Sequence, residues 1–307
     1  MGVEKPSNSD QLKTRATYLA VRALTPVIDR GLENIARTKP VEFPEGFEDA
    51  YLEARRNGKV PIFYSNHTAQ EDANSLGVLM SEIFSMEQTL PYNDRLRDVR
   101  LPLAHSLHSG AQGPVIQGIY HAEAGFLERH HIDPLHLVRA KDVNEDTPPN
   151  FDEYKTELMD SIRNGSGVIF FPEGDTTGGK RNAEGKINGM HAFQENAMRS
   201  LILLTKRAGK EPILIPVGIE GGFRFQVPET KKPSRWALRV GFGFSDRTLV
   251  RIKAGMPIDP QDELLTDLIK NRRWQEVDGV LEKKVAELLP SNHRGIHREQ
   301  VIFPGGS

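Results

Sequence analysis

Short apolar runs of strand length alternate along the chain with longer segments whose apolar positions repeat at helical spacing. Strands are predicted over 60–64, 100–104, 135–138, 168–171 and 212–219, with a later pair over 238–244 and 249–254. Helices are predicted over 68–85, 113–125, 151–163, 191–207 and 261–289. This alternation predicts an α/β fold with a mixed, largely parallel central sheet flanked by helices.

Residues 11–38 are predicted to form an amphipathic helix that precedes this pattern. Seven Lys and Arg residues stand against four acidic residues between positions 1 and 40. Such a helix either packs its apolar face on the rest of the chain or lies on an anionic membrane surface. We therefore expect an N-terminal helical segment over 1–57 and one α/β domain over 58–307.

Composition excludes several classes of function. None of the 307 residues is Cys, which excludes a disulfide framework, a thiolate metal site and a Cys nucleophile. The net charge of −2 gives no reason to expect a nucleic-acid partner. The first residues carry no apolar segment of the kind that a secretory signal needs, and no apolar run is long enough to span a membrane. We expect a cytoplasmic protein, with peripheral contact at the inner face of a membrane as the open alternative.

A first candidate site follows the strand predicted over 60–64. His67 lies where the chain turns from this strand into a helix, and Asp72 follows five residues later on the first turns of that helix. Ligands bind most often at the carboxyl ends of strands in such folds. A carboxylate can hold one ring N–H of an imidazole and leave the other nitrogen as a general base. The same spacing also fits a capping histidine beside a solvent-facing aspartate.

A second candidate site follows the strand predicted over 168–171. The loop after it is rich in Gly and cations, and it begins with Glu173 and Gly174. It matches a nucleotide-binding P-loop until Arg181 occupies the position where Ser or Thr must contact magnesium, and no good helix start follows. What fits better is a loop whose backbone amides face an anion such as a phosphate together with three cations, namely Lys180, Arg181 and Lys186. A solvated surface loop is the other interpretation.

Together the segments resemble the glycerolipid acyltransferase family, which includes the lysophosphatidate and glycerol-3-phosphate acyltransferases. Four motifs carry the resemblance, in the family's order over residues 58–222. They are the histidine and aspartate with four residues between them, the strand ending in Arg139, the block Phe171-Pro172-Glu173-Gly174, and the proline-containing strand Ile213-Leu214-Ile215-Pro216-Val217.

The resemblance implies direct acyl transfer in phospholipid biosynthesis, with no metal and no cofactor other than the co-substrate. His67 is the implied general base on an acceptor hydroxyl, and Asp72 orients its ring. The donor would be acyl-CoA or acyl-carrier protein, and the acceptor glycerol-3-phosphate or 1-acylglycerol-3-phosphate. Arg139, Glu173 and Gly174 are the implied acceptor-binding residues, with Glu173 contacting a hydroxyl or a neighbouring cation.

The chain departs from the family pattern after Gly174. The family usually continues with Thr-Arg-Ser, whereas this chain reads Asp175-Thr176-Thr177. This difference keeps the first of two alternatives open, whereas the intact His67 and Asp72 argue against the second. One is an acyltransferase with a non-phosphate lysolipid acceptor, and the other is a catalytically silent relative that binds membrane surfaces.

Overall fold

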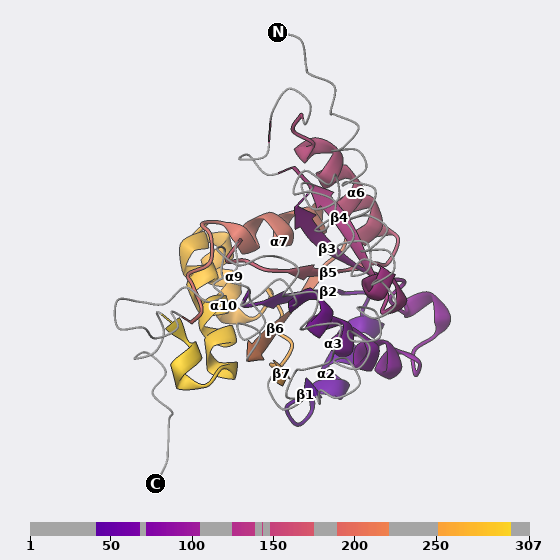
Figure 1. Ribbon diagram of the computed structural model, residues 1–307, viewed down its shortest axis with the longest axis horizontal. Coiled ribbons are helices and arrows are strands. Elements are labelled where there is room, and N and C mark those ends of the chain that lie inside the picture. The colour runs from indigo at the N-terminus through magenta and orange to yellow at the C-terminus, as the bar shows by residue number, and fades with distance from the viewer. Residues whose placement is uncertain are drawn as a thin grey trace, which may run out of the picture.

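A seven-stranded mixed sheet forms the centre of the computed structural model (Figure 1). The structure describes residues 41–67, 72–104, 125–138, 143, 148–174, 189–220 and 251–295. The strands lie in the order β1-β7-β6-β2-β5-β3-β4. Their bounds are β1 Val41–Glu42, β2 Val60–Ser65, β3 Val99–Ala104, β4 Ile132–Leu137, β5 Gly167–Phe170, β6 Pro212–Glu220 and β7 Arg251–Ala254. The α/β architecture predicted from the sequence is confirmed.

Five neighbouring strands, from β6 to β4, run parallel, and among the strand pairs of the described residues only β6–β7 is antiparallel. The central strands are apolar on both faces, as a parallel sheet covered by helices requires. In β2, Ile62 and Tyr64 point to one face and Phe63 to the other, and all three are fully buried. Because β2 pairs in parallel with both β5 and β6, the carboxyl ends of these three strands share one edge of the sheet.

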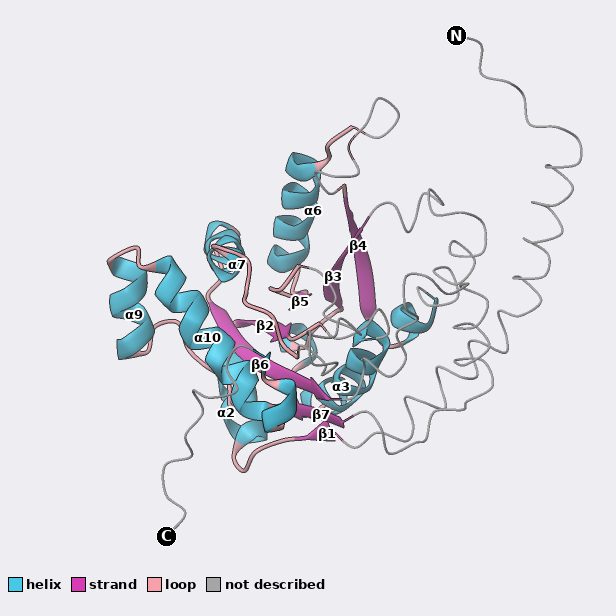
Figure 2. Cartoon of the chain, turned by 60° about the vertical axis from the view of Figure 1, so that its left-hand side comes forward, coloured by secondary structure: helices cyan, strands magenta, loops and turns pink. Residues whose placement is uncertain are grey.

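Helices cover both faces of the sheet, as Figure 2 shows with α6, α7, α9 and α10 on one side of the row of strands and α3 on the other. One apolar cluster joins the sheet to α2 and α3, and the second joins it to α6, α7, α9 and α10. The bounds are α2 Phe47–Arg56, α3 Asp72–Glu87, α6 Phe151–Arg163, α7 Ala197–Arg207, α9 Glu263–Lys270 and α10 Trp274–Leu288, with short 3₁₀ helices η1 Tyr92–Asp94 and η4 Ser291–His293.

A buried carboxylate fixes the last turn of α3. Glu87 accepts hydrogen bonds from the Tyr51 hydroxyl at 2.5 Å and from Arg55 Nε at 2.8 Å, both on α2, and from the backbone N–H of Leu96. Its side chain is 1% exposed, so the charge depends on these donors for its stability. The helix that begins at Asp72 is thus held firmly at its far end.

Two predicted helices have different bounds in the structure. The helix predicted over 191–207 begins only at Ala197, because Asn196 directly before it has a left-handed φ of 61°, which a continuous α-helix does not allow. The single helix predicted over 261–289 is two helices, α9 and α10. The chain reverses between them at Arg272, whose φ of 58° is left-handed.

The strand predictions hold with smaller changes. β4 begins at Ile132, three residues earlier than predicted, and tolerates Pro134 because it is an edge strand. β7 lies within the strand predicted over 249–254 and pairs with β6 and β1, whereas its predicted partner over 238–244 lies outside the described residues. The helix predicted over 11–38 and most of that over 113–125 also lie outside them. β1 and α2 were not predicted as separate elements.

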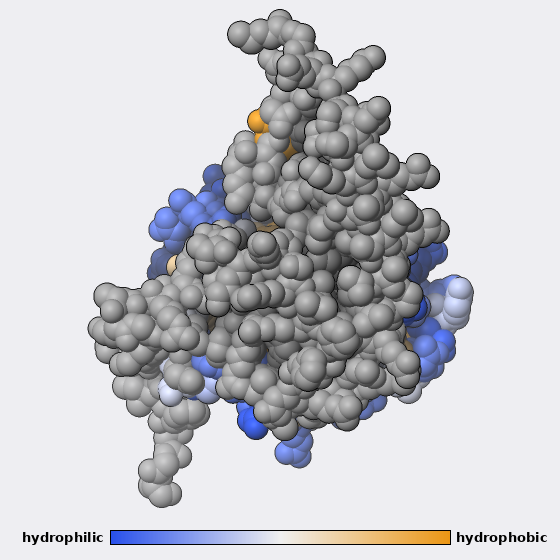
Figure 3. Space-filling view, viewed as in Figure 1, coloured by the Kyte–Doolittle hydropathy of each residue, from blue (hydrophilic) through white to orange (hydrophobic). Residues whose placement is uncertain are grey.

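The described surface is mainly hydrophilic where it reaches the rim of the molecule in Figure 3. Within the described residues, no helix combines the length and the apolar character that crossing a membrane demands.

Candidate functional site

The register of β2 and β5 brings the two candidate motifs together. Tyr64 and Phe170 are partners in this parallel pair. His67 follows Tyr64 by three residues, and Glu173 follows Phe170 by three. Both residues therefore leave the sheet at the same level and the same edge. The backbone N–H of His67 donates to Glu173 Oε1 at 3.0 Å, which joins the two turns directly.

Asn66 fixes the chain just before His67. Its side-chain Nδ2 donates to the carbonyl of Ile219 at 2.9 Å, and its Oδ1 accepts the N–H of Ile219 at 2.8 Å. Asn66 is 1% exposed, so both hydrogen bonds are shielded from water. The amide continues the β2–β6 pairing past the end of the strand and sets the direction in which the chain enters the turn.

His67 and Asp72 form the pair that the sequence predicts. His67 Nδ1 lies 3.2 Å from Asp72 Oδ2. The Asp72 side chain is fully buried, whereas that of His67 is 19% exposed. Because a carboxylate only accepts hydrogen bonds, we assign the proton to Nδ1, which leaves the lone pair of the neutral ring on Nε2. The arrangement suits a general base whose protonated form is stabilised by a buried anion.

Phe171 supports the imidazole from the side. Its ring stacks on that of His67 with centroids 4.2 Å apart and an interplanar angle of 19°. Phe171 directly follows β5, so the strand pairing that aligns the two turns also places this ring. The stack and the Asp72 contact together restrict both the tilt and the rotation of the imidazole.

Both carboxylate oxygens of Glu173 accept backbone hydrogen bonds from the protein itself. Oε1 takes the N–H of His67, and Oε2 takes the N–H of His191, each at 3.0 Å. Glu173 is 6% exposed. The structure thus gives Glu173 an internal bridging role, and the acceptor-binding role implied by the resemblance stays a prediction.

The environment of Glu173 favours its protonated form. Burial raises its pKa to about 8, the N–H groups of His191 and His67 oppose the shift, and the charges of Asp72 and Glu282 add to it. A protonated carboxyl group offers one carbonyl oxygen to a donor. Ionisation supplies a second full acceptor and makes both bonds charge-assisted. The bridge between His67 and His191 is therefore strongest in the ionised form.

Gly174 ends this turn in a conformation that few other residues adopt. Its φ is +71°, and its N–H donates to the carbonyl of Phe171 at 3.0 Å. A Cβ added here would collide with the side chain of Gln194, whose backbone N–H in turn donates to the Pro172 carbonyl at 2.9 Å. The left-handed backbone conformation favours glycine here, and a Cβ would in addition displace the end of the Gln194 side chain.

The structure places four of the eight predicted site residues and leaves four outside its described part. His67, Asp72, Glu173 and Gly174 lie together at one edge of the sheet. The others, Arg139, Lys180, Arg181 and Lys186, lie outside the described residues.

Sequence reasoning missed two features of this site. His191 joins it through its backbone, which leaves no trace in the choice of residue type. Asn66 was visible beside His67 as a polar residue at the end of an apolar strand, a signal that could have indicated its structural role.

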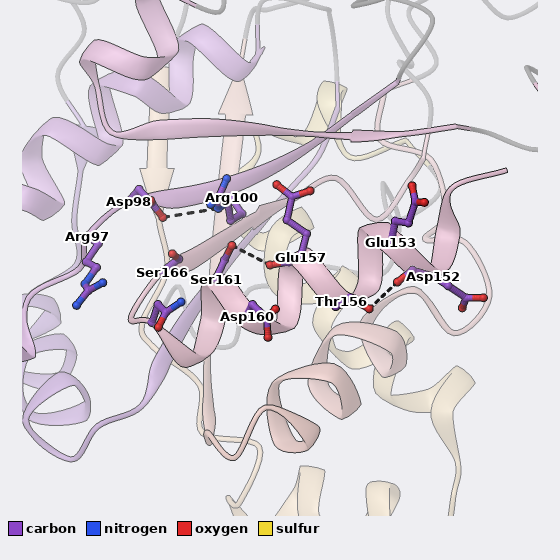
Figure 4. Close-up of a pocket in the computed structure, with 11 residues that line it drawn as sticks. Arg97, Asp98, Arg100, Asp152, Glu153, Thr156, Glu157, Asp160, Ser161 and Ser166 are labelled. Carbon is purple, nitrogen blue, oxygen red and sulfur yellow. Dashed lines mark hydrogen bonds and ion pairs between the residues drawn. The ribbon is translucent and has the colours of Figure 1, made fainter. Parts of the chain in front are cut away.

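A separate groove of about 790 Å³ lies at the opposite edge of the sheet (Figure 4). It runs along α6 beside the residues that precede β3 and β5, including Asp98 and Ser166. Several of its acidic groups already have basic neighbours, such as Asp98 with Arg100 and Asp152 with Lys155. The groove is remote from the His67 edge, since the strands between them are parallel. Among the described residues, no three His, Asp or Glu side chains are grouped closely enough to hold a metal ion.

Comparisons with known proteins add no assignment. No protein-family model matches the chain, and no curated protein matches it.

Proposed function

We propose that this chain is an O-acyltransferase that moves a fatty acyl group from acyl-CoA or acyl-carrier protein to the hydroxyl of a glycerophosphate-type acceptor. The observation that carries the proposal is the His67–Asp72 pair, which lies next to the Phe171–Gly174 turn at one edge of the sheet. These two motifs are also two of the four that carry the resemblance to the glycerolipid acyltransferases. The two lines of support meet at these residues.

In the proposed reaction, His67 Nε2 removes the proton of the acceptor hydroxyl as its oxygen attacks the thioester carbonyl. The C–O bond forms, the C–S bond breaks, and the proton is delivered to the departing thiolate. Asp72 keeps the ring in the required tautomer and stabilises the transient imidazolium. No covalent acyl-enzyme is required, so the absence of Cys from the sequence is compatible with this chemistry.

The acceptor is tested by measuring thiol release from palmitoyl-CoA in parallel reactions. Glycerol-3-phosphate, 1-acylglycerol-3-phosphate and a phosphate-free lysolipid are each added to the full-length protein, and the panel is repeated with acyl-carrier protein as the donor. Release that depends on a glycerophosphate supports the proposal. Release with the phosphate-free acceptor alone would replace the acceptor class, and no release with any pair would indicate a silent relative.

A further inference from the structure

The segment from Gly189 to Asn196 contacts the turn at Pro172 and Glu173 and does not form a helix. In this contact, His191 donates its backbone N–H to Glu173 Oε2 at 3.0 Å, and Gln194 donates its backbone N–H to the Pro172 carbonyl at 2.9 Å. Since Glu173 Oε1 holds His67 in the same way, the segment and the His67 turn share one carboxylate. Glu173 therefore links the backbone of His191 to that of His67.

Helix α10 also contacts this segment. Phe193 donates its backbone N–H to Glu282 Oε2 at 2.6 Å, and Glu282 is 6% exposed. Two residues before His191 the chain is equally confined, because a Cβ on Gly189 would meet the backbone of Gly295 at 2.6 Å. Met190 donates its N–H to the carbonyl of His293 at 2.9 Å. Contacts from α10 and the turn after it thus flank His191 on both sides.

We propose that Glu282 is a positioning residue for His67. It fixes the position of Phe193, and thereby that of His191, so that the Glu173 carboxylate can bridge the backbones of His191 and His67. The sequence assigned no role to residues 223–307, and Glu282 lies in no recognisable motif. The catalytic consequence of this inference rests on the proposed function, whereas its structural part does not.

The environment of Glu173 supports the same connection. The charge of Glu282 contributes to the raised pKa of Glu173, so the two carboxylates interact through space as well as through the chain between them. The ring of Phe193 also packs edge-on against Tyr64, with centroids 6.2 Å apart. Tyr64 is a residue of β2, the strand that ends just before His67. Phe193 thus contacts the His67 strand directly.

Helix α10 offers a matched control for this role. Asp278 lies one turn before Glu282, is 5% exposed, and accepts the backbone N–H of Met198 at 3.2 Å. It therefore resembles Glu282 in burial and in the kind of bond that it makes. It also accepts the backbone N–H of Asn196, the residue before α7, so both of its partners lie beyond His191 and Gln194, which contact the turn at Glu173. Loss of Asp278 loosens the packing of α10 without removing the support of His191.

The test compares Glu282→Ala, Glu282→Gln and Asp278→Ala in the full-length protein. The first readout is the imidazole ¹H–¹⁵N spectrum of His67, assigned by its absence in His67→Ala and followed through a pH titration. We expect Glu282→Ala to shift the His67 signals and Glu282→Gln to restore them, because the amide oxygen of Gln can still accept the Phe193 N–H. Asp278→Ala should leave them close to wild type.

The second readout is turnover. Small misplacements of a catalytic group can lower rates by as much as about a hundredfold. We expect kcat of Glu282→Ala to fall at least about tenfold with little change in KM, and that of Asp278→Ala to stay within about threefold of wild type. Unchanged His67 signals in Glu282→Ala, or equal changes in Asp278→Ala, would overturn the inference. If the wild-type protein releases no thiol, the spectra still decide the positioning role independently of the proposed reaction.

Discussion

Replacing Glu173 with Gln removes a buried titratable group while keeping its size and one acceptor oxygen. In the unfolded chain this carboxyl group has an ordinary pKa of 4.5, and in the folded protein its pKa is about 8. Between these values the folded protein holds a proton that the unfolded chain has lost. The stabilising contribution of the group is therefore complete below pH 4.5 and is lost as the pH rises towards 8.

The size of this effect follows from the two pKa values. At 1.36 kcal/mol for each pH unit, the wild-type protein should lose about 5 kcal/mol of unfolding free energy through this group over that interval. Glu173→Gln cannot lose it. The variant carries a separate, pH-independent cost of about 1–3 kcal/mol, because its amide NH₂ faces one of the two backbone N–H donors.

Urea denaturation followed by circular dichroism at several pH values from 5 to 8.5 measures this difference. Titrations of groups that do not interact with Glu173 cancel when variant and wild type are compared at the same pH. We expect the variant to gain stability relative to wild type as the pH rises. Glu53→Gln on the exposed surface of α2 is the control, because it lacks the burial that causes the effect. A wild-type-to-Glu173→Gln difference that stays constant from pH 5 to 8.5 would refute the reasoning.

Two further predictions concern the backbone around the site. Asn66→Ala should lower the unfolding free energy by about 2–4 kcal/mol, because it leaves the buried N–H and C=O of Ile219 without their partners, and chemical denaturation measures this loss. Gly174→Ala should destabilise the protein more than Gly58→Ala does in thermal unfolding. Both glycines have φ of +71°, but only at Gly174 does the added methyl group meet another side chain, so equal losses would contradict the role of the Gln194 contact.

How far the sequence predicted the site depended on whether its parts are local. His67 and Asp72 are five residues apart, and the strand-to-helix change between them is visible in the hydrophobic pattern, so their contact could be expected. The turn at Glu173 and Gly174 could be expected for the same reason. Their meeting required the β2–β5 pairing, which alternation of elements suggests but does not specify.

Contacts through the backbone could not be predicted. His191 and Phe193 enter the site through their N–H groups, which every residue except Pro carries. The helix predicted over 191–207 begins six residues late because Asn196 adopts a left-handed conformation, which the hydrophobic pattern does not reveal. The role of Glu282 depends on a partner 89 positions away in the chain, and its helical surroundings resemble those of any amphipathic helix.

The central claim is that His67 acts as a general base in acyl transfer, and the most direct measurement is acceptor-dependent thiol release by wild type, His67→Ala and Asp72→Asn. A general base contributes about 10²–10⁴ to the rate, so His67→Ala should lose at least a hundredfold in kcat while its circular dichroism stays that of the folded protein. Asp72→Asn should also lose most of its turnover, because the amide no longer selects the required tautomer. A folded His67→Ala protein that turns over at a rate near that of wild type would contradict the account.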